Sequence, residues 1–246
     1  TFLNHSPIIR VSAIEKIGFN LLKKEIKKIC DSIEEKTDRG VFRMPVDRVF
    51  TKRGFGTVIT GTVASGSLEK GNSIEVLPSG LNVKVRNIQS HGKLVNNVII
   101  GDRAAVNFQG LDAEKIHRGC QLVSPGYFLS TKQIGAFVKI LTSIKKPITQ
   151  NQRIRIHIGT QEVMARISLV EMGKLLPGEI STAFLKLESP ITASIGDKFI
   201  IRSYSPISTI AGGEIIDNEV SGKWAAIKTY LKNIYNFELG LDIPYM

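Results

Sequence analysis

The sequence is poor in residue types that several classes of protein require. Its 246 residues include only two cysteines, Cys30 and Cys120. Their spacing fits neither a disulfide framework nor a pair of metal ligands. We therefore expect reduced thiols, as in a cytoplasmic protein. The four histidines also lack the spacing of metal ligands, so no metal site and no histidine-based catalytic group is expected.

Long apolar runs and nucleotide-binding motifs are missing as well. No apolar stretch approaches the roughly 20 residues that span a bilayer, and no basic leader precedes one. No Gly-x-x-x-x-Gly-Lys-Ser/Thr loop occurs, and residues 35–38 (Glu-Lys-Thr-Asp) match a guanine-reading Asn-Lys-x-Asp only superficially. We expect this chain to bind a partner and not to act as an enzyme, with no cofactor of its own.

Positive charge, by contrast, is abundant. The chain has 33 lysines and arginines against 22 aspartates and glutamates, a formal net charge of +11. Such an excess favours a polyanionic partner. Charge alone does not choose between RNA, DNA and an acidic protein. It favours an RNA-facing role over that of a small-molecule enzyme.

The first 40 residues have the pattern of a strand followed by a helix. Residues 7–11 are short and apolar, as a buried parallel strand is, and apolar residues then recur at helical spacing from Ile17 to Ile33. Gly40 is a suitable helix end. One strand and one helix cannot make a core. With no initiator methionine at Thr1, we expect residues 1–40 to be the end of an α/β domain in a longer protein.

The pattern changes at Val41. Short alternating or apolar runs are separated by Gly, Pro, Asn and Ser about every ten residues, which is typical of β-barrels. We predict a mainly β fold with two consecutive barrels, residues 41–125 and 126–217. The expected strands include Thr57–Thr62, Ser73–Leu77, Val83–Ile88, Ala104–Phe108, Gly119–Val123, Gln133–Leu141, Arg153–Ile158, Glu162–Val170, Ile180–Leu187 and Asp197–Ser203.

The C-terminal segment, residues 218–246, is expected to be helical. Trp224, Ile227, Leu231 and Ile234 fit one face of a helix. Two interpretations stay open: the helix packs back on the preceding barrel, or it is a linker to the next domain or the start of that domain.

One long ordered motif carries a family resemblance. Residues 42–50 (Phe-Arg-Met-Pro-Val-Asp-Arg-Val-Phe) lead into residues 54–63 (Gly-Phe-Gly-Thr-Val-Ile-Thr-Gly-Thr-Val) and 66–72 (Gly-Ser-Leu-Glu-Lys-Gly-Asn). Gly-Asp-Arg at 101–103 and Arg-Gly at 118–119 follow in order. Together these segments resemble the second domain of translational GTPases.

Within that family, the chain resembles the selenocysteine-specific elongation factors, SelB. Asp47-Arg48 combined with Arg103 is a SelB-like pattern, where factors of the EF-Tu type usually have Glu-Asp and Asn. Residues 204–217 are similar to the end of the SelB third domain, with Ala211 where Gly is expected. The resemblance covers roughly residues 7–217.

The resemblance implies a tRNA-binding role and particular site residues. Asp47, Arg48, His91 and Arg103 would line the pocket for the aminoacyl group, and Arg118 would contact the tRNA 5′ phosphate. Ser12 and Ala13 would belong to the loop that closes on the guanine base. The implied partners are selenocysteyl-tRNA and the ribosome. A selenoprotein mRNA hairpin would bind only through further domains, and GTP with Mg²⁺ only in the full-length parent.

The arginines have a physical meaning in such a pocket. Selenols are more acidic than thiols, so selenocysteine is largely an anion at neutral pH, whereas serine on the same tRNA is neutral. Arg48 and Arg103 would stabilise the selenolate through charge-assisted contacts, and Asp47 would hold one arginine in place.

Plainer interpretations remain. Asp47-Arg48 also fits a surface ion pair, Arg103 and His91 fit turn residues, and Arg118 fits an exposed arginine. The alternatives for the whole chain are a general aminoacyl-tRNA carrier or initiation-factor subunit, a GTPase partner in a sulfate-activating complex, and a ribosome-docking or protein-interaction module. The two arginines disfavour the first of these alternatives. The positive charge and the SelB-like ending disfavour the second.

Overall fold

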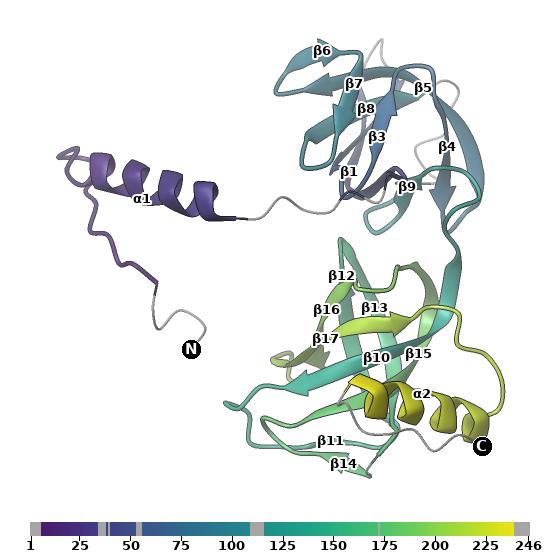
Figure 1. Cartoon of the computed structure of the whole chain (residues 1–246). Coiled ribbons are helices and arrows are strands. Elements are labelled where there is room, and N and C mark those ends of the chain that lie inside the picture. Colours follow the sequence, from purple (N-terminus) through teal and green to yellow (C-terminus); the bar gives the residue numbers. More distant parts are fainter. Residues whose placement is uncertain are drawn as a thin grey trace. The chain divides into compact units, whose positions relative to one another are not determined.

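The computed structural model describes residues 6–33, 38, 40–52, 56–108, 116–171 and 173–238. Gly54 and Phe55 of the long motif therefore lie outside the described residues. So do residues 35–37 of the incomplete guanine-reading motif and residues 239–246 of the expected C-terminal segment. The chain divides into two compact units, Thr1–Asp38 and Arg39–Met246 (Figure 1).

Within its described residues, 6–33 and 38, the first unit contains one helix. α1 (Phe19–Ser32) confirms the helix predicted from the apolar spacing, and its apolar side chains are exposed. The strand predicted at residues 7–11 is wrong. The only pairing nearby is an isolated bridge between Ser12 and Ile17, and Ile8 is 95% exposed. A strand needs a neighbouring strand for its backbone hydrogen bonds, and the described residues of this unit provide none.

The first barrel is built from the strands that follow residue 42. Their bounds are β1 (Arg43–Lys52), β2 (Gly56–Thr62), β3 (Ser67–Glu69), β4 (Ser73–Leu77), β5 (Leu81–Ser90), β6 (Lys93–Val95), β7 (Asn97–Ile99), β8 (Arg103–Phe108) and β9 (Gln121–Val123). The sheet order is β4-β9-β1-β2-β8-β5-β6, and pairing of β4 with β5 closes the ring. β3 and β7 form a separate pair.

The second barrel is also a closed ring of strands. Its bounds are β10 (Ser130–Ile140), β11 (Ile148–Thr149), β12 (Gln152–Ile158), β13 (Gln161–Leu169), β14 (Lys174–Leu175), β15 (Ile180–Thr192), β16 (Lys198–Ser203) and β17 (Thr209–Asp217). The closed order is β10-β15-β13-β12-β16-β17, with β11 and β14 paired separately. The prediction of a mainly β fold with two barrels is confirmed.

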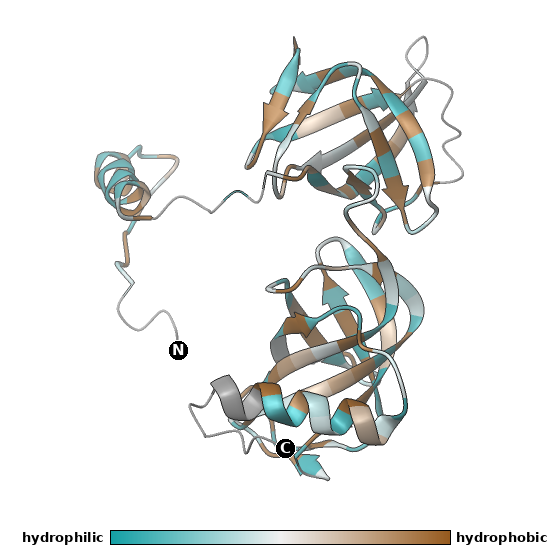
Figure 2. Cartoon of the chain, turned by 45° about the vertical axis from the view of Figure 1, so that its right-hand side comes forward, coloured by the Kyte–Doolittle hydropathy of each residue, from teal (hydrophilic) through white to brown (hydrophobic). Residues whose placement is uncertain are grey.

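Apolar side chains at alternate positions along the strands fill the barrel interiors. In β12, Ile154, Ile156 and Ile158 are buried while the residues between them face outward. Figure 2 shows the resulting change between hydrophobic and hydrophilic bands along the strands. Ala211, where the family pattern suggests Gly, is buried within β17 and pairs with Ile140.

α2 (Trp224–Glu238) packs against the second barrel, as one of the two interpretations of the C-terminal helix expects; a link to another domain stays a prediction. Ile227 and Leu231 are buried together with Phe184. Gly135 makes room for the helix, because a Cβ there would lie 2.6 Å from Leu231 Cδ2. Neither helix of the described part of the chain has the length and apolar character needed to cross a membrane.

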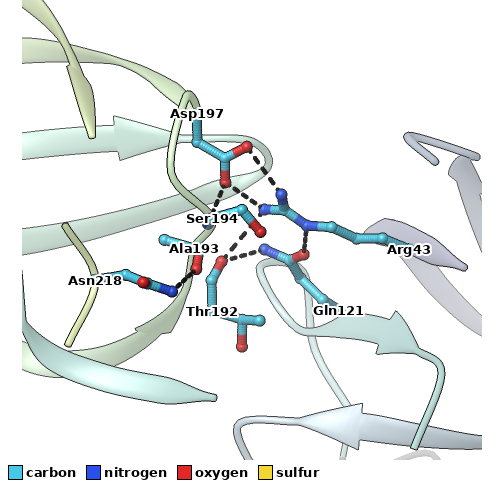
Figure 3. A network of polar contacts seen from close by, with 7 residues as sticks. All are labelled: Arg43, Gln121, Thr192, Ala193, Ser194, Asp197 and Asn218. Atoms are coloured by element: carbon cyan, nitrogen blue, oxygen red, sulfur yellow. Dashed lines mark hydrogen bonds and ion pairs between the residues drawn. The ribbon is translucent and has the colours of Figure 1, made fainter. Parts of the chain in front are cut away.

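A buried polar network joins the two barrels (Figure 3). Arg43 of β1 donates to both carboxylate oxygens of Asp197, which precedes β16, at 2.8 and 2.7 Å. Its Nε donates to Gln121 Oε1 at 2.5 Å, and Gln121 Nε2 donates to the Thr192 carbonyl oxygen at 2.5 Å. We call Arg43, Gln121, Thr192 and Asp197 the inter-barrel joint. The Arg43 side chain is only 10% exposed, and each of its guanidinium nitrogens has a partner.

The loop that carries Asp197 is itself held in place. The Ser194 backbone N–H donates to Asp197 Oδ2 at 2.8 Å, and Asn218 Nδ2 donates to the Ala193 carbonyl oxygen at 2.6 Å. Asp197 therefore meets Arg43 with its position already fixed by its own barrel.

The hairpin tip between β12 and β13 makes a second contact between the barrels. Arg118 Nε of the first barrel donates to the Thr160 carbonyl oxygen at 3.3 Å. Gly119 has φ +100°, and a Cβ there would lie 3.1 Å from Gln161. A side chain at 119 would therefore crowd the hairpin tip.

Candidate functional site

A β-bulge shapes the segment that contains Asp47 and Arg48. β1 pairs with β2 as Val46↔Gly61 and then Arg48↔Thr60, so Asp47 is the extra residue. Gly61 permits this close approach, because a Cβ there would lie 2.3 Å from the Pro45 carbonyl oxygen. Bulges of this kind redirect side chains next to binding sites.

Asp47 forms an ion pair with Arg103. Arg103 is the first residue of β8, and its guanidinium donates to Asp47 Oδ2 at 2.5 Å and to Thr62 Oγ1 at 3.5 Å. The side chains are 53% and 26% exposed for Arg103 and Asp47, respectively. The guanidinium is thus held at one edge while much of it faces solvent.

Three arginines act on the Asp47 carboxylate. Its pKa lies below the ordinary value, mainly because Arg103 donates a hydrogen bond to it; burial opposes the shift, and the charges of Arg103, Arg48 and Arg118 add to it. We call Asp47, Arg48, Arg103 and Arg118 the arginine cluster. One carboxylate facing three guanidiniums leaves the cluster with an excess of positive charge.

Two threonines, not selected from the sequence, lie on the same sheet face as the arginines. Thr60 is directly opposite Arg48, and Thr62 is directly opposite Arg103. Thr60 Oγ1 is buried and has no hydrogen-bond partner in the described part of the chain. A hydroxyl in a strand gives no distinctive sequence signal, so only the register reveals these residues.

His91 is a turn residue between β5 and β6. It is exposed, with φ +50°, and is followed by Gly92. The neighbouring Ser90 hydroxyl donates to the Arg103 carbonyl oxygen at 3.0 Å, so the turn starts beside the first residue of β8. Among the described residues, His91 itself makes no hydrogen bond or ion pair. Its assignment to the pocket stays a prediction.

Family models match both barrels. Residues 56–123 match elongation factor Tu domain 2, and residues 136–221 match the β-barrel domain of the selenocysteine-specific elongation factor. A selenocysteine-specific elongation factor from Desulfomicrobium baculatum is 36% identical over 217 residues. Over the residues it shares with them, this chain is similar to the selenocysteine-specific elongation factors.

The shared region is a part of these factors. The D. baculatum match covers 88% of this chain and 34% of that factor. A factor of the same name from Methanocaldococcus jannaschii is 34% identical, and the match covers 92% of this chain and 52% of that protein. The chain therefore spans between about one third and one half of the length of these relatives.

Solved structures of selenocysteine-specific elongation factors have the same fold. The apo form of SelB from Methanococcus maripaludis superimposes with a TM-score of 0.78 and 29% identity, covering 89% of this chain and 51% of that one. A bacterial EF-Sec gives a TM-score of 0.80 and 28% identity, covering 97% and 39%.

The remaining site residue predictions fall in the first unit. Ser12 precedes a turn at residues 13–16, and its hydroxyl accepts a hydrogen bond from the Glu15 N–H at 3.2 Å. Ala13 is exposed in that turn. Their role in a guanine-binding loop stays a prediction. No group of three or more His, Cys, Asp or Glu side chains suited to a metal ion occurs among the residues that the structure describes.

Proposed function

We propose that this chain is the tRNA-binding part of a selenocysteine-specific elongation factor and that the arginine cluster selects the selenocysteyl group. The observation that carries the proposal is the ion pair between Asp47 and Arg103 beside Arg48. Arg48 and Arg103 supply two positive charges, and the Asp47 carboxylate positions Arg103. This arrangement fits a site for an anionic ligand.

Discrimination against serine follows from charge. A selenolate is an acceptor for charge-assisted hydrogen bonds, which stabilise by about 1.5–3 kcal/mol each. A neutral serine hydroxyl gains less from the same guanidiniums and leaves part of their charge without a counterion. Each productive arginine contact is therefore expected to contribute about tenfold to the preference for selenocysteine.

The rest of the factor's activity is part of the same proposal. The longer protein would bind GTP with Mg²⁺ and hydrolyse the nucleotide, and it would deliver selenocysteyl-tRNA to the ribosome. Recognition of a selenoprotein mRNA hairpin would require domains beyond this chain. The net charge of +11 supports an RNA partner.

The test compares one tRNA in two charged states. The affinity of the full factor with GTP is measured for selenocysteine tRNA carrying selenocysteine or serine, under reducing conditions. We expect a clear preference for selenocysteine in the wild type. Arg103→Ala should lower that preference about tenfold, chiefly by weakening binding of the selenocysteyl form.

Arg86→Ala is the matched control, because Arg86 is an exposed arginine of the same barrel outside the cluster. It should leave the preference unchanged. Equal affinity of the wild-type factor for both charged forms would contradict selenolate selection and favour a general aminoacyl-tRNA carrier.

A further inference from the structure

Thr62 stands directly opposite Arg103 in the first barrel. It is the last residue of β2, and Arg103 is the first residue of β8. Side chains of such a directly opposed pair lie on the same face of the sheet. The Arg103 guanidinium donates from one terminal nitrogen to Thr62 Oγ1 at 3.5 Å and from the other to Asp47 Oδ2 at 2.5 Å. Both terminal nitrogens of Arg103 therefore have an acceptor.

The two acceptors restrict different motions of the Arg103 side chain. The charge-assisted bond to Asp47 is the short one, and it sets the direction in which the side chain points. A guanidinium is a rigid plane, so a single anchored nitrogen still permits the plane to turn about its anchor. An acceptor at the second terminal nitrogen limits this turn. The N–H groups that remain for a ligand then keep one orientation.

The backbone around the pair gives the Thr62 hydroxyl a fixed position. The Val63 N–H donates to the Asp102 carbonyl oxygen at 2.9 Å, which ties the end of β2 to the start of β8. The Ser90 hydroxyl donates to the Arg103 carbonyl oxygen at 3.0 Å. The branched Cβ of threonine also restricts its χ1 angle. The second acceptor of Arg103 is therefore as well placed as the strand that carries it.

Orientation matters for the ligand because hydrogen bonds weaken steeply as their angle departs from linear. A guanidinium that turned about the Asp47 contact would average well-aligned and poorly aligned positions. Thr62 is exposed, so its side chain is not needed to fill the core. Its contact with Arg103 thus points to a role in the arginine cluster.

We propose that Thr62 is a positioning residue that fixes the plane of the Arg103 guanidinium and so increases the preference for the selenocysteyl group. The inference rests on the proposed function of the arginine cluster. It gives Thr62 no contact with the ligand, so the whole effect of Thr62 on selectivity passes through Arg103.

The first test measures selectivity in the full factor with GTP, on selenocysteine tRNA charged with selenocysteine or with serine. Thr62→Val keeps the shape of the side chain and removes the acceptor. It should lower the preference for selenocysteine about fivefold, less than the tenfold loss expected for Arg103→Ala. Thr62→Ser retains the hydroxyl and should restore the preference. In the Arg103→Ala background, Thr62→Val should have no further effect, because the group that it positions is gone.

Thr51→Val is the matched control, since Thr51 is an exposed threonine of β1 outside the arginine cluster. It should leave the preference unchanged. The proposal would be overturned by equal effects of Thr62→Val and Thr51→Val, or by a failure of Thr62→Ser to restore the preference. An undiminished effect of Thr62→Val in the Arg103→Ala background would overturn it too, because Thr62 would then act without Arg103.

The second test observes the guanidinium without any tRNA. In the isotopically labelled chain, NMR measures the rate at which the two terminal nitrogens of Arg103 exchange places by rotation about the Nε–Cζ bond. Loss of one acceptor should make this exchange about fivefold faster in Thr62→Val and leave it unchanged in Thr62→Ser and Thr51→Val.

The two tests separate failure of the positioning from failure of the proposed function. Equal wild-type affinities for the two charged forms would refute selenolate selection, and the exchange rate would still decide whether Thr62 holds Arg103. Equal exchange rates in the wild type and Thr62→Val would overturn the positioning even where selenolate selection holds.

Discussion

Two arginine–aspartate pairs in this chain have the same chemistry and different surroundings. Arg43 and Asp197 make two parallel hydrogen bonds in the inter-barrel joint, and their side chains are 10% and 24% exposed. Arg103 and Asp47 make one short bond in the arginine cluster, where Arg103 is 53% exposed. The first guanidinium is saturated with partners, whereas the second retains capacity for another one.

The difference separates a structural pair from a binding pair. A buried arginine whose nitrogens all have partners can only hold its neighbours in place. An exposed arginine anchored by one carboxylate keeps its orientation and still offers N–H groups to a ligand. The joint thus fixes the barrels, while the cluster presents charge at the surface of one of them.

The largest effect is expected from breaking the buried pair. Asp197→Asn preserves the shape of the side chain but leaves the Arg43 charge without a counterion. The free energy of unfolding should fall by about 3 kcal/mol. Urea unfolding followed by circular dichroism measures this loss.

Glu188→Gln is the control, because the Arg153–Glu188 pair is similarly bidentate but exposed. It should change stability little, since solvent screens such pairs. Equal losses for Asp197→Asn and Glu188→Gln would remove the distinction between buried and exposed pairs.

A smaller effect on stability is expected from Arg103→Ala. The pair it removes is largely exposed, so the free energy of unfolding should fall by less than about 1 kcal/mol. The same urea titration provides the comparison with Asp197→Asn. A loss as large as that of Asp197→Asn would show that Arg103 is mainly a structural residue, contrary to its proposed role.

The smallest effect concerns the titration of Asp47. Its folded-state pKa lies below the ordinary value of 3.8. The stabilisation it provides is therefore complete above pH 3.8 and is lost as the pH falls through the folded-state pKa. NMR titration of the Asp47 carboxyl carbon should give a midpoint below 3.8 in the wild type and closer to 3.8 in Arg103→Ala. Identical midpoints would contradict the ion pair in solution.

Local patterns predicted most of the barrel strands. Ser73–Leu77 was expected from its apolar run and is β4, and the alternation of residues 153–158 lies within β12. The pattern at residues 7–11 was equally apolar and gave no strand. Apolar character identifies a segment able to pair, but pairing also requires a neighbour that a local pattern cannot specify.

The candidate site was predictable only in part, because its contacts join distant segments. Resemblance pointed to Asp47, Arg48 and Arg103, but the bulge that places Asp47 depends on the register with β2. Arg43 and Asp197 are 154 residues apart, and a single charged residue leaves no periodic signal. The position of α2 likewise depends on the absence of a side chain at Gly135, which leaves room for Leu231.

The order of the strands in the second barrel has a consequence for its synthesis. β10 is the first strand made, yet it pairs with β17, the last, as well as with β15. The barrel cannot close until residue 217 has left the ribosome, and until then β10 keeps an unpaired edge. Arg43 also lacks its ion-pair partner when synthesis of the first barrel is complete, because Asp197 is made well after β9. A nascent chain that stalls before residue 197 would therefore expose both a sheet edge and the Arg43 charge without its counterion.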